Sequence, residues 1–199
     1  RLGRPDEALA AIRKTVELSP PDRTSALLTV AGFCLQIGRP DEALAQARVA
    51  RDLGDRNADE VIARAELARG NADAAEAAAR RALEGSPSTR PNALFALARV
   101  AALRGDVNGA LARTEEVRAA AGGRAEVASL QGFHALRGDL LARLGRTAEA
   151  ERELLTEIRL FPQAVEARVA LAATYAALGR RAEAVRTIDE MVRLLPRPD

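Results

Sequence analysis

Few side chains in this 199-residue sequence could do covalent or metal chemistry. It holds one histidine, His134, and one cysteine, Cys34. A lone histidine and a lone cysteine supply neither the ligand set of a zinc site nor an internal disulfide. No GxSxG elbow, GxxxxGKS/T phosphate loop or HExxH pair occurs. We therefore predict no enzyme, no metal and no cofactor, and interpret His134 as a packing or surface residue and Cys34 as a small buried hydrophobe.

Charge and aromatic content argue against a nucleic-acid partner. The sequence has 30 basic and 28 acidic residues, for a net charge of +2, and only 3% aromatic residues. Nucleic-acid surfaces combine a basic stripe with stacking aromatics, and the sequence indicates neither. The longest run without a charged residue, Thr24–Gly38, is shorter than the roughly 18 residues of a membrane-spanning helix. We predict no nucleic-acid partner and no membrane span.

The strongest pattern is a repeat. The octapeptide GRPDEALA occurs at residues 3–10 and again at 38–45. Weaker copies of the octapeptide follow along the chain. The glycines that begin the six copies are spaced by 35, 32, 35, 40 and 34 residues: Gly3, Gly38, Gly70, Gly105, Gly145 and Gly179. An alanine follows each glycine by five residues: Ala8, Ala43, Ala75, Ala110, Ala150 and Ala184. A small residue precedes it by seven in every copy that is long enough: Ala31, Ala63, Ala98, Gly138 and Ala172.

Each repeated position has a physical meaning. A glycine after a helix adopts the left-handed conformation that turns the chain, and Pro40 then fits the first position of the next helix. Asp41 and Glu42 follow in the first turn, where the helix dipole favours negative charge. The small residues let two helices approach closely. The pattern therefore predicts a helix–turn–helix unit used repeatedly, and an all-α fold.

The period and these positions resemble the tetratricopeptide repeat. The best match is the last unit, through Leu171, Ala172, Tyr175, Gly179, Ala184, Ile188 and Pro196. The second unit matches through Leu27, Val30, Ala31, Cys34, Gly38 and Ala43, whereas the third has Glu66 where the family expects an aromatic residue. The resemblance implies a right-handed α-solenoid that serves as a protein- or peptide-binding scaffold or adaptor.

On this basis residues 1–199 form a single solenoid with a half unit at residues 1–20. The full units are expected at about residues 23–54, 56–87, 91–122, 124–162 and 163–196. Gly122 and Gly123 are expected to open a long first helix over residues 124–144. Because the sequence begins within a repeat, we expect it to be a piece of a longer protein, whose exposed ends could self-associate.

The resemblance also implies a concave groove lined by the first helix of each unit. The candidate groove residues are Leu28, Arg64, Asn92, Phe95, Arg99 and Arg143. Arg64 and Arg99 recur at a spacing of 35, so a solenoid would place them about 10 Å apart, which suits a partner with acidic groups or a free carboxylate.

Three of these groove residues, Arg64, Arg99 and Phe95, keep alternative interpretations. The arginines are either ligand-binding groups or solvated partners of Glu60 and Glu66. Phe95 is either an anchor for a ligand side chain or a packing residue against the adjacent unit.

Two other functions stay open at this stage. Residues 157–196 are similar to repeat tails on bacterial hydrolases of the sulfatase type, so the chain could be the non-catalytic tail of a larger enzyme. An RNA-binding array of helical hairpins has a similar period. Glu60, Asp139 and Glu166 on the first-helix face argue against that array.

Overall fold

The computed structural model describes residues 5–18, 23–122, 127 and 130–194, and every element in these ranges is a helix. The predicted all-α fold is confirmed. The helices gather into two compact units, Arg1–Leu103 (unit 1) and Arg104–Asp199 (unit 2).

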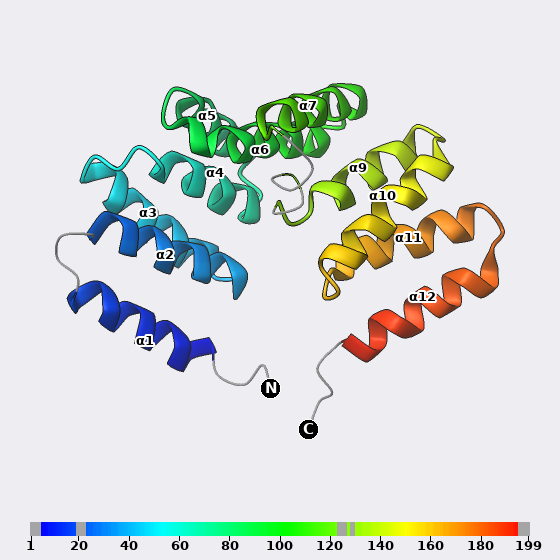
Figure 1. The fold of residues 1–199 in the computed structure, drawn as a ribbon, viewed down its shortest axis with the longest axis horizontal. Coiled ribbons are helices and arrows are strands. Elements are labelled where there is room, and N and C mark those ends of the chain that lie inside the picture. The colour runs from blue at the N-terminus through cyan, green and yellow to red at the C-terminus, as the bar shows by residue number, and fades with distance from the viewer. Residues whose placement is uncertain (1–4, 19–22, 123–126, 128–129, 195–199) are drawn as a thin grey trace. The chain divides into compact units, whose positions relative to one another are not determined.

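Unit 1 is a stack of antiparallel helix pairs (Figure 1). Its elements are α1 (Pro5–Leu18), α2 (Arg23–Gln36), α3 (Pro40–Asp52), α4 (Ala58–Ala68), α5 (Ala72–Leu83), the short 3-10 turn η2 (Pro87–Thr89) and α6 (Arg90–Leu103). Each helix packs on the next along the chain, and the first helices α2, α4 and α6 also contact one another in sequence. One hydrophobic core runs through the unit and includes Val30, Ile62 and Leu97.

Unit 2 follows the same plan with α7 (Val107–Ala120), α9 (Phe133–Arg143), α10 (Thr147–Leu160), α11 (Val165–Ala177) and α12 (Arg181–Leu194). The first helices α9 and α11 contact each other, and α7 packs on α9. Leu154 of α10 joins Leu171 and Tyr175 of α11 in the core of this unit.

The turn between paired helices has the conformation that the sequence predicts. Gly38 has a φ of 74°, and Gly179 repeats the same value. At the first of these turns the N–H of Arg39 donates to the carbonyl of Cys34 at 2.8 Å, which is the hydrogen bond of a Schellman motif. Pro40 then begins α3. This turn fixes the antiparallel direction of the two helices.

The small residues of the repeat lie where the paired helices touch. Side chains with 0% exposure include Ala43, Ala75, Ala110 and Ala150, whereas Ala8 is exposed because α1 presents Leu9 to the core instead. A Cβ added to Gly138 would lie 2.5 Å from Cγ of Leu154, so α9 approaches α10 more closely than an alanine would allow. Cys34 is fully buried, as predicted, and burial raises the pKa of its thiol.

The expected long first helix over residues 124–144 is wrong. Residues 123–126 and 128–129 lie outside the described part of the chain, but Leu130 is in a bend and the following two residues form a turn. Gly132 has a φ of 86°, which a continuous right-handed helix does not accommodate. The first helix of the fifth unit therefore begins at Phe133 and is the short helix α9.

Candidate functional site

Five of the six predicted groove residues lie on the first helices of unit 1. Leu28 lies on α2, Arg64 on α4, and Asn92, Phe95 and Arg99 on α6. Because α4 contacts both α2 and α6, one layer of helices carries all five, and we call these five residues the unit 1 face. This face combines two apolar side chains, Leu28 and Phe95, with three polar ones, Arg64, Asn92 and Arg99.

The centre of the unit 1 face holds an ion pair with one buried member. Glu60 is 5% exposed, and its Oε1 is buried without a hydrogen bond. The nearest cation is the Arg64 guanidinium, whose Nη1 lies 3.5 Å from that oxygen, too far for a strong hydrogen bond. Burial raises the pKa of Glu60, and the positive charge of Arg64 opposes the rise. The Arg64 side chain is 42% exposed, and its only ion pair among the described residues is this long contact with Glu60.

The other members of the unit 1 face differ in exposure. Leu28 is half-buried and packs against the hydrophobic core of the unit. Phe95 and Asn92 are also half-buried, and Arg99 is exposed at the next turn of α6. The face thus offers half-buried apolar side chains and two solvent-accessible guanidinium groups on adjacent helices.

Arg143, the sixth predicted residue, belongs to unit 2. It lies at the end of α9, where its Nη2 is 2.8 Å from Oδ2 of Asp139. Both side chains are at least 40% exposed, so the pair is a solvated contact between neighbouring turns of one helix. The structure does not group Arg143 with the unit 1 face.

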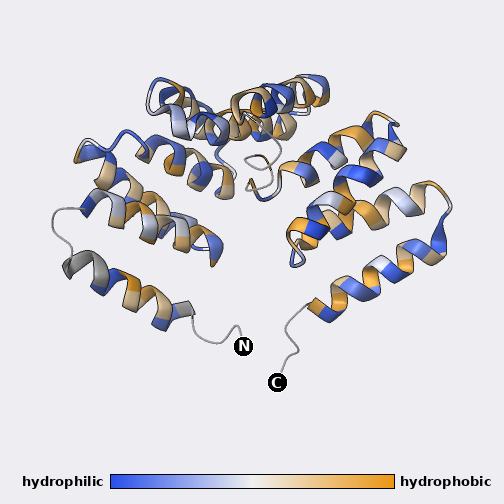
Figure 2. Cartoon of the chain, viewed as in Figure 1, coloured by the Kyte–Doolittle hydropathy of each residue, from blue (hydrophilic) through white to orange (hydrophobic). Residues whose placement is uncertain are grey.

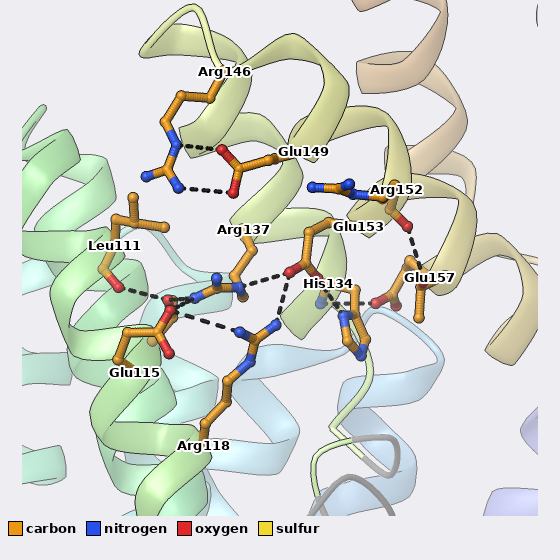
Figure 3. Close-up of polar contacts among 12 residues, drawn as sticks. Leu111, Glu115, Arg118, His134, Arg137, Arg146, Glu149, Arg152, Glu153 and Glu157 are labelled. Carbon is orange, nitrogen blue, oxygen red and sulfur yellow. Dashed lines mark hydrogen bonds and ion pairs between the residues drawn. The ribbon is translucent and has the colours of Figure 1, made fainter.

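A cluster of charged residues in unit 2, absent from the sequence interpretation, joins three helices (Figure 3). Glu153 of α10 lies at its centre, with His134 Nδ1 at 2.5 Å and Arg137 Nε at 3.1 Å, both from α9. From α7, Arg118 donates to Glu153 at 2.7 Å, and Glu115 accepts from Arg137 at 2.7 Å. Burial alone would raise the pKa of Glu153, but hydrogen bonds from His134 and Arg137 and the nearby arginine charges lower it to about 2.

A second glutamate of α10, Glu157, closes the N-terminus of α9. Its side chain is fully buried and accepts from the N–H groups of Gly132 at 2.6 Å, His134 at 3.1 Å and Ala135 at 3.3 Å. Gly132 occupies the N-cap position and has no side chain to do this itself. Glu157 therefore acts as an N-cap supplied from another helix.

The charged cluster holds helices together, and its geometry does not resemble a catalytic site. The carboxylates of Glu153 and Glu157 are each engaged by donors of the protein itself. Within the described ranges, no three histidine, cysteine, aspartate or glutamate side chains gather as metal ligands would. In that same part of the chain, no helix is both long and apolar enough to span a membrane.

Comparison with known protein families identifies the repeat. A tetratricopeptide repeat model matches residues 1–58 and 136–197, and a second model of the same repeat matches residues 91–116. The chain belongs to the tetratricopeptide repeat family. Membership supports a role as a protein-interaction scaffold in general, and such repeats are generally non-catalytic. No protein of curated function matches the sequence with statistical significance.

Solved tetratricopeptide repeat structures share the fold at low sequence identity. TTC0263, a thermophilic TPR protein in Thermus thermophilus, is 22% identical with a TM-score of 0.69, over 87% of this chain and 92% of that one. A chain of the APC/C hetero-tetramer Cut9–Hcn1 is 17% identical with a TM-score of 0.80, over 99% of this chain but 38% of that one. YrrB, described as a TPR protein with an unusual peptide-binding site, is 17% identical with a TM-score of 0.53, over 94% and 93%.

Proposed function

We propose that this protein is a scaffold or adaptor that binds an extended protein segment along the unit 1 face. An acidic group of the partner, a side-chain or terminal carboxylate, binds Arg64 and Arg99. An apolar side chain of the partner packs against Leu28 and Phe95, and Asn92 bonds to its backbone. Stacked first helices are rigid before binding, so little ordering entropy is lost on the side of the scaffold.

The observation that carries this proposal is the position of Arg64 above Glu60. The carboxyl of Glu60 is buried, has a raised pKa and lies 3.5 Å from the guanidinium, so it satisfies few of the five donors of Arg64. The buried carboxyl attracts the guanidinium at Nη1, and the other donors of Arg64 are not bound by Glu60. A planar, pre-positioned guanidinium suits bidentate binding of a carboxylate.

A peptide-display selection on the purified chain, followed by affinity measurements on the selected peptides, tests the proposal. The decisive comparison is Arg99→Ala against Arg80→Ala. Both remove one exposed arginine charge from unit 1, but Arg80 lies on the second helix α5. We expect Arg99→Ala and Phe95→Ala each to weaken binding about ten-fold or more, and Arg80→Ala to leave it unchanged.

Selected peptides should also carry a carboxylate near an apolar residue. If Arg80→Ala weakens binding as much as Arg99→Ala, or if the selected peptides are basic, the unit 1 face is not the binding site.

A further inference from the structure

The helix α11 carries a buried positive charge. Arg168 is 7% exposed, in a helix whose residues are mostly hydrophobic (Figure 2). Its Nε is buried without a hydrogen-bond partner, and its Nη1 donates to the carbonyl of Ala164 at 3.2 Å. Within the described ranges, no carboxylate forms an ion pair with this guanidinium. A buried charge without a counter-charge is costly, so an anion that reached Arg168 would be bound favourably.

The other buried arginine of unit 2 indicates what such a charge binds when a carboxylate is near. Arg137 of α9 is 6% exposed, and its guanidinium donates to Glu153 at 3.1 Å and to Glu115 at 2.7 Å. Two carboxylates therefore neutralise Arg137, whereas Arg168 has one backbone carbonyl as its partner in the described part of the chain. Most of the five donors of Arg168 are left for another acceptor.

The start of α11 also lacks a negative partner. Its N-cap residue is Ala164, and no side chain caps the helix. The first N–H groups of a helix have no acceptor within it, and the helix dipole adds positive charge at this end. Glu166, the acidic residue of the first turn, is exposed and does not cap the helix. Because Arg168 donates to the N-cap carbonyl, its guanidinium lies at the same helix end as these N–H groups.

In the preceding helix pair, the second helix supplies the negative charge. Glu157 of α10 accepts from the N–H groups at the start of α9, and Glu153 of α10 binds the cationic side chains of that helix. The repeat is 34 residues long here, so the equivalent of Glu157 in α12 is Met191. The equivalent of Glu153 is Thr187. The last helix pair therefore has a buried arginine and an uncapped helix start without the two carboxylates of the pair before it.

We propose that the start of α11 is a binding site for an oxyanion of the phosphate class. The guanidinium of Arg168 and the backbone N–H groups of Glu166 and Ala167 hold the oxyanion. A guanidinium and the free N–H groups of a helix are both donors that proteins use to bind phosphate. This inference goes beyond the binding of a partner by the unit 1 face, because it concerns another unit and another class of ligand.

Thermal unfolding of the 199-residue chain in inorganic phosphate tests the proposal, since a ligand that binds only the folded chain raises the melting temperature. We expect sodium phosphate to raise it more than sodium chloride or sodium acetate at the same ionic strength. Arg168→Met should weaken phosphate binding about ten-fold or more and so remove this difference. It should not lower the melting temperature in phosphate-free buffer, because it removes an unpaired buried charge. Arg186→Met, at an exposed arginine of α12, is the matched control and should keep the response.

A second variant tests the site without removing Arg168. Met191→Glu gives α12 the carboxylate that Glu157 supplies in α10. It should raise the melting temperature in phosphate-free buffer and reduce the response to phosphate, because the carboxylate competes for the same donors. A phosphate titration followed by amide NMR locates the site directly, and we expect the amide signals of Glu166 and Ala167 to shift.

Four results would overturn the proposal. They are a melting temperature that phosphate raises no more than chloride or acetate, an Arg168→Met variant that keeps the response, an Arg186→Met variant that loses it equally, and amide shifts confined to residues away from the start of α11. The titration and Met191→Glu decide the question even if Arg168→Met does not fold.

Discussion

Glu66 in unit 1 and Glu157 in unit 2 are both glutamates buried between helices, yet they bind different groups. Glu66 accepts from three side chains: Arg69 at 2.8 Å, Asn71 at 2.8 Å and Arg48 at 3.2 Å. Glu157 accepts from the backbone N–H groups that begin α9. A side chain that loses its partner can turn to solvent, whereas a buried N–H group cannot. We therefore expect replacement of Glu66 to be tolerated and replacement of Glu157 to destabilise the fold.

The two units also differ in the residues that pack between their paired helices. In α4 and α5 of unit 1, Ala63 and Ala79 are both fully buried. At the equivalent positions of α9 and α10, a glycine meets a leucine, Gly138 and Leu154. Both combinations, two alanines or a glycine and a leucine, occupy this position between the paired helices. Only in the second does the large residue require the small one, because an added Cβ at Gly138 would meet Leu154.

The largest expected effect is that of Glu157→Leu. The substitution leaves buried N–H groups at the start of α9 without an acceptor, so we expect the free energy of unfolding to fall by about 4 kcal/mol. Chemical denaturation monitored by circular dichroism measures it. Glu116→Leu, an exposed glutamate of α7, is the control and should change stability by less than about 0.5 kcal/mol.

Lowering the pH should destabilise unit 2 through Glu153. The pKa of this carboxyl is about 2 in the folded protein, against 4.5 for an ordinary glutamate. Its stabilisation is therefore complete above pH 4.5 and is lost as the pH falls through 2. Because the carboxyl is partly exposed and solvent screens its contacts, the stabilisation is smaller than the roughly 3 kcal/mol of an unscreened shift of this size. We expect Glu153→Gln to remove most of this acid dependence, and an unchanged pH profile would show that other carboxyl groups cause it.

Gly138→Ala should cost about 2 kcal/mol, because the added methyl group meets the buried Leu154 side chain. Leu154→Ala relieves the contact, so the double variant should cost less than the two single changes together by about 1 kcal/mol. The mirror experiment in unit 1 replaces Ala63 with glycine and Ala79 with leucine. If the double variant costs as much unfolding free energy as the two single variants together, Gly138 and Leu154 do not depend on each other.

Glu66→Leu should have the smallest effect, a change of less than about 1 kcal/mol. The three donors that bind Glu66 are side chains on polar surfaces, and an apolar residue of similar size is a tolerated substitute for a buried charge. Denaturation of Glu66→Leu beside Glu157→Leu makes the comparison direct. If the two variants lose equal free energy of unfolding, burial of the glutamate determines the loss and the kind of donor that it binds does not.

The sequence predicts the fold well because the repeat is a local signal. Gly38 and Gly179 turn the chain as expected, and Ala43 and Ala150 are buried as expected, since each position depends on spacing within one unit. The start of α9 could not be predicted in this way. It depends on Glu157, which lies 25 residues from the Gly132 N–H that it binds and has no repeated counterpart that would reveal its role.

The same limit applies to the candidate sites. Spacing places Leu28, Arg64 and Phe95 on first helices, and they lie there. It also suggests Glu60 as a partner of Arg64, but it does not indicate that the carboxyl is buried beneath the guanidinium with a raised pKa. The charged cluster around Glu153 was missed because its members come from three helices.

The most direct test of the central claim is to map a bound peptide on the protein by amide NMR shifts, using the tightest peptide from the display selection. Our account predicts that the shifted amides lie on α2, α4 and α6 near the unit 1 face, and that Arg99→Ala reduces the shifts at equal peptide concentration. Shifts confined to the second helices α3 and α5, or to unit 2, would contradict it.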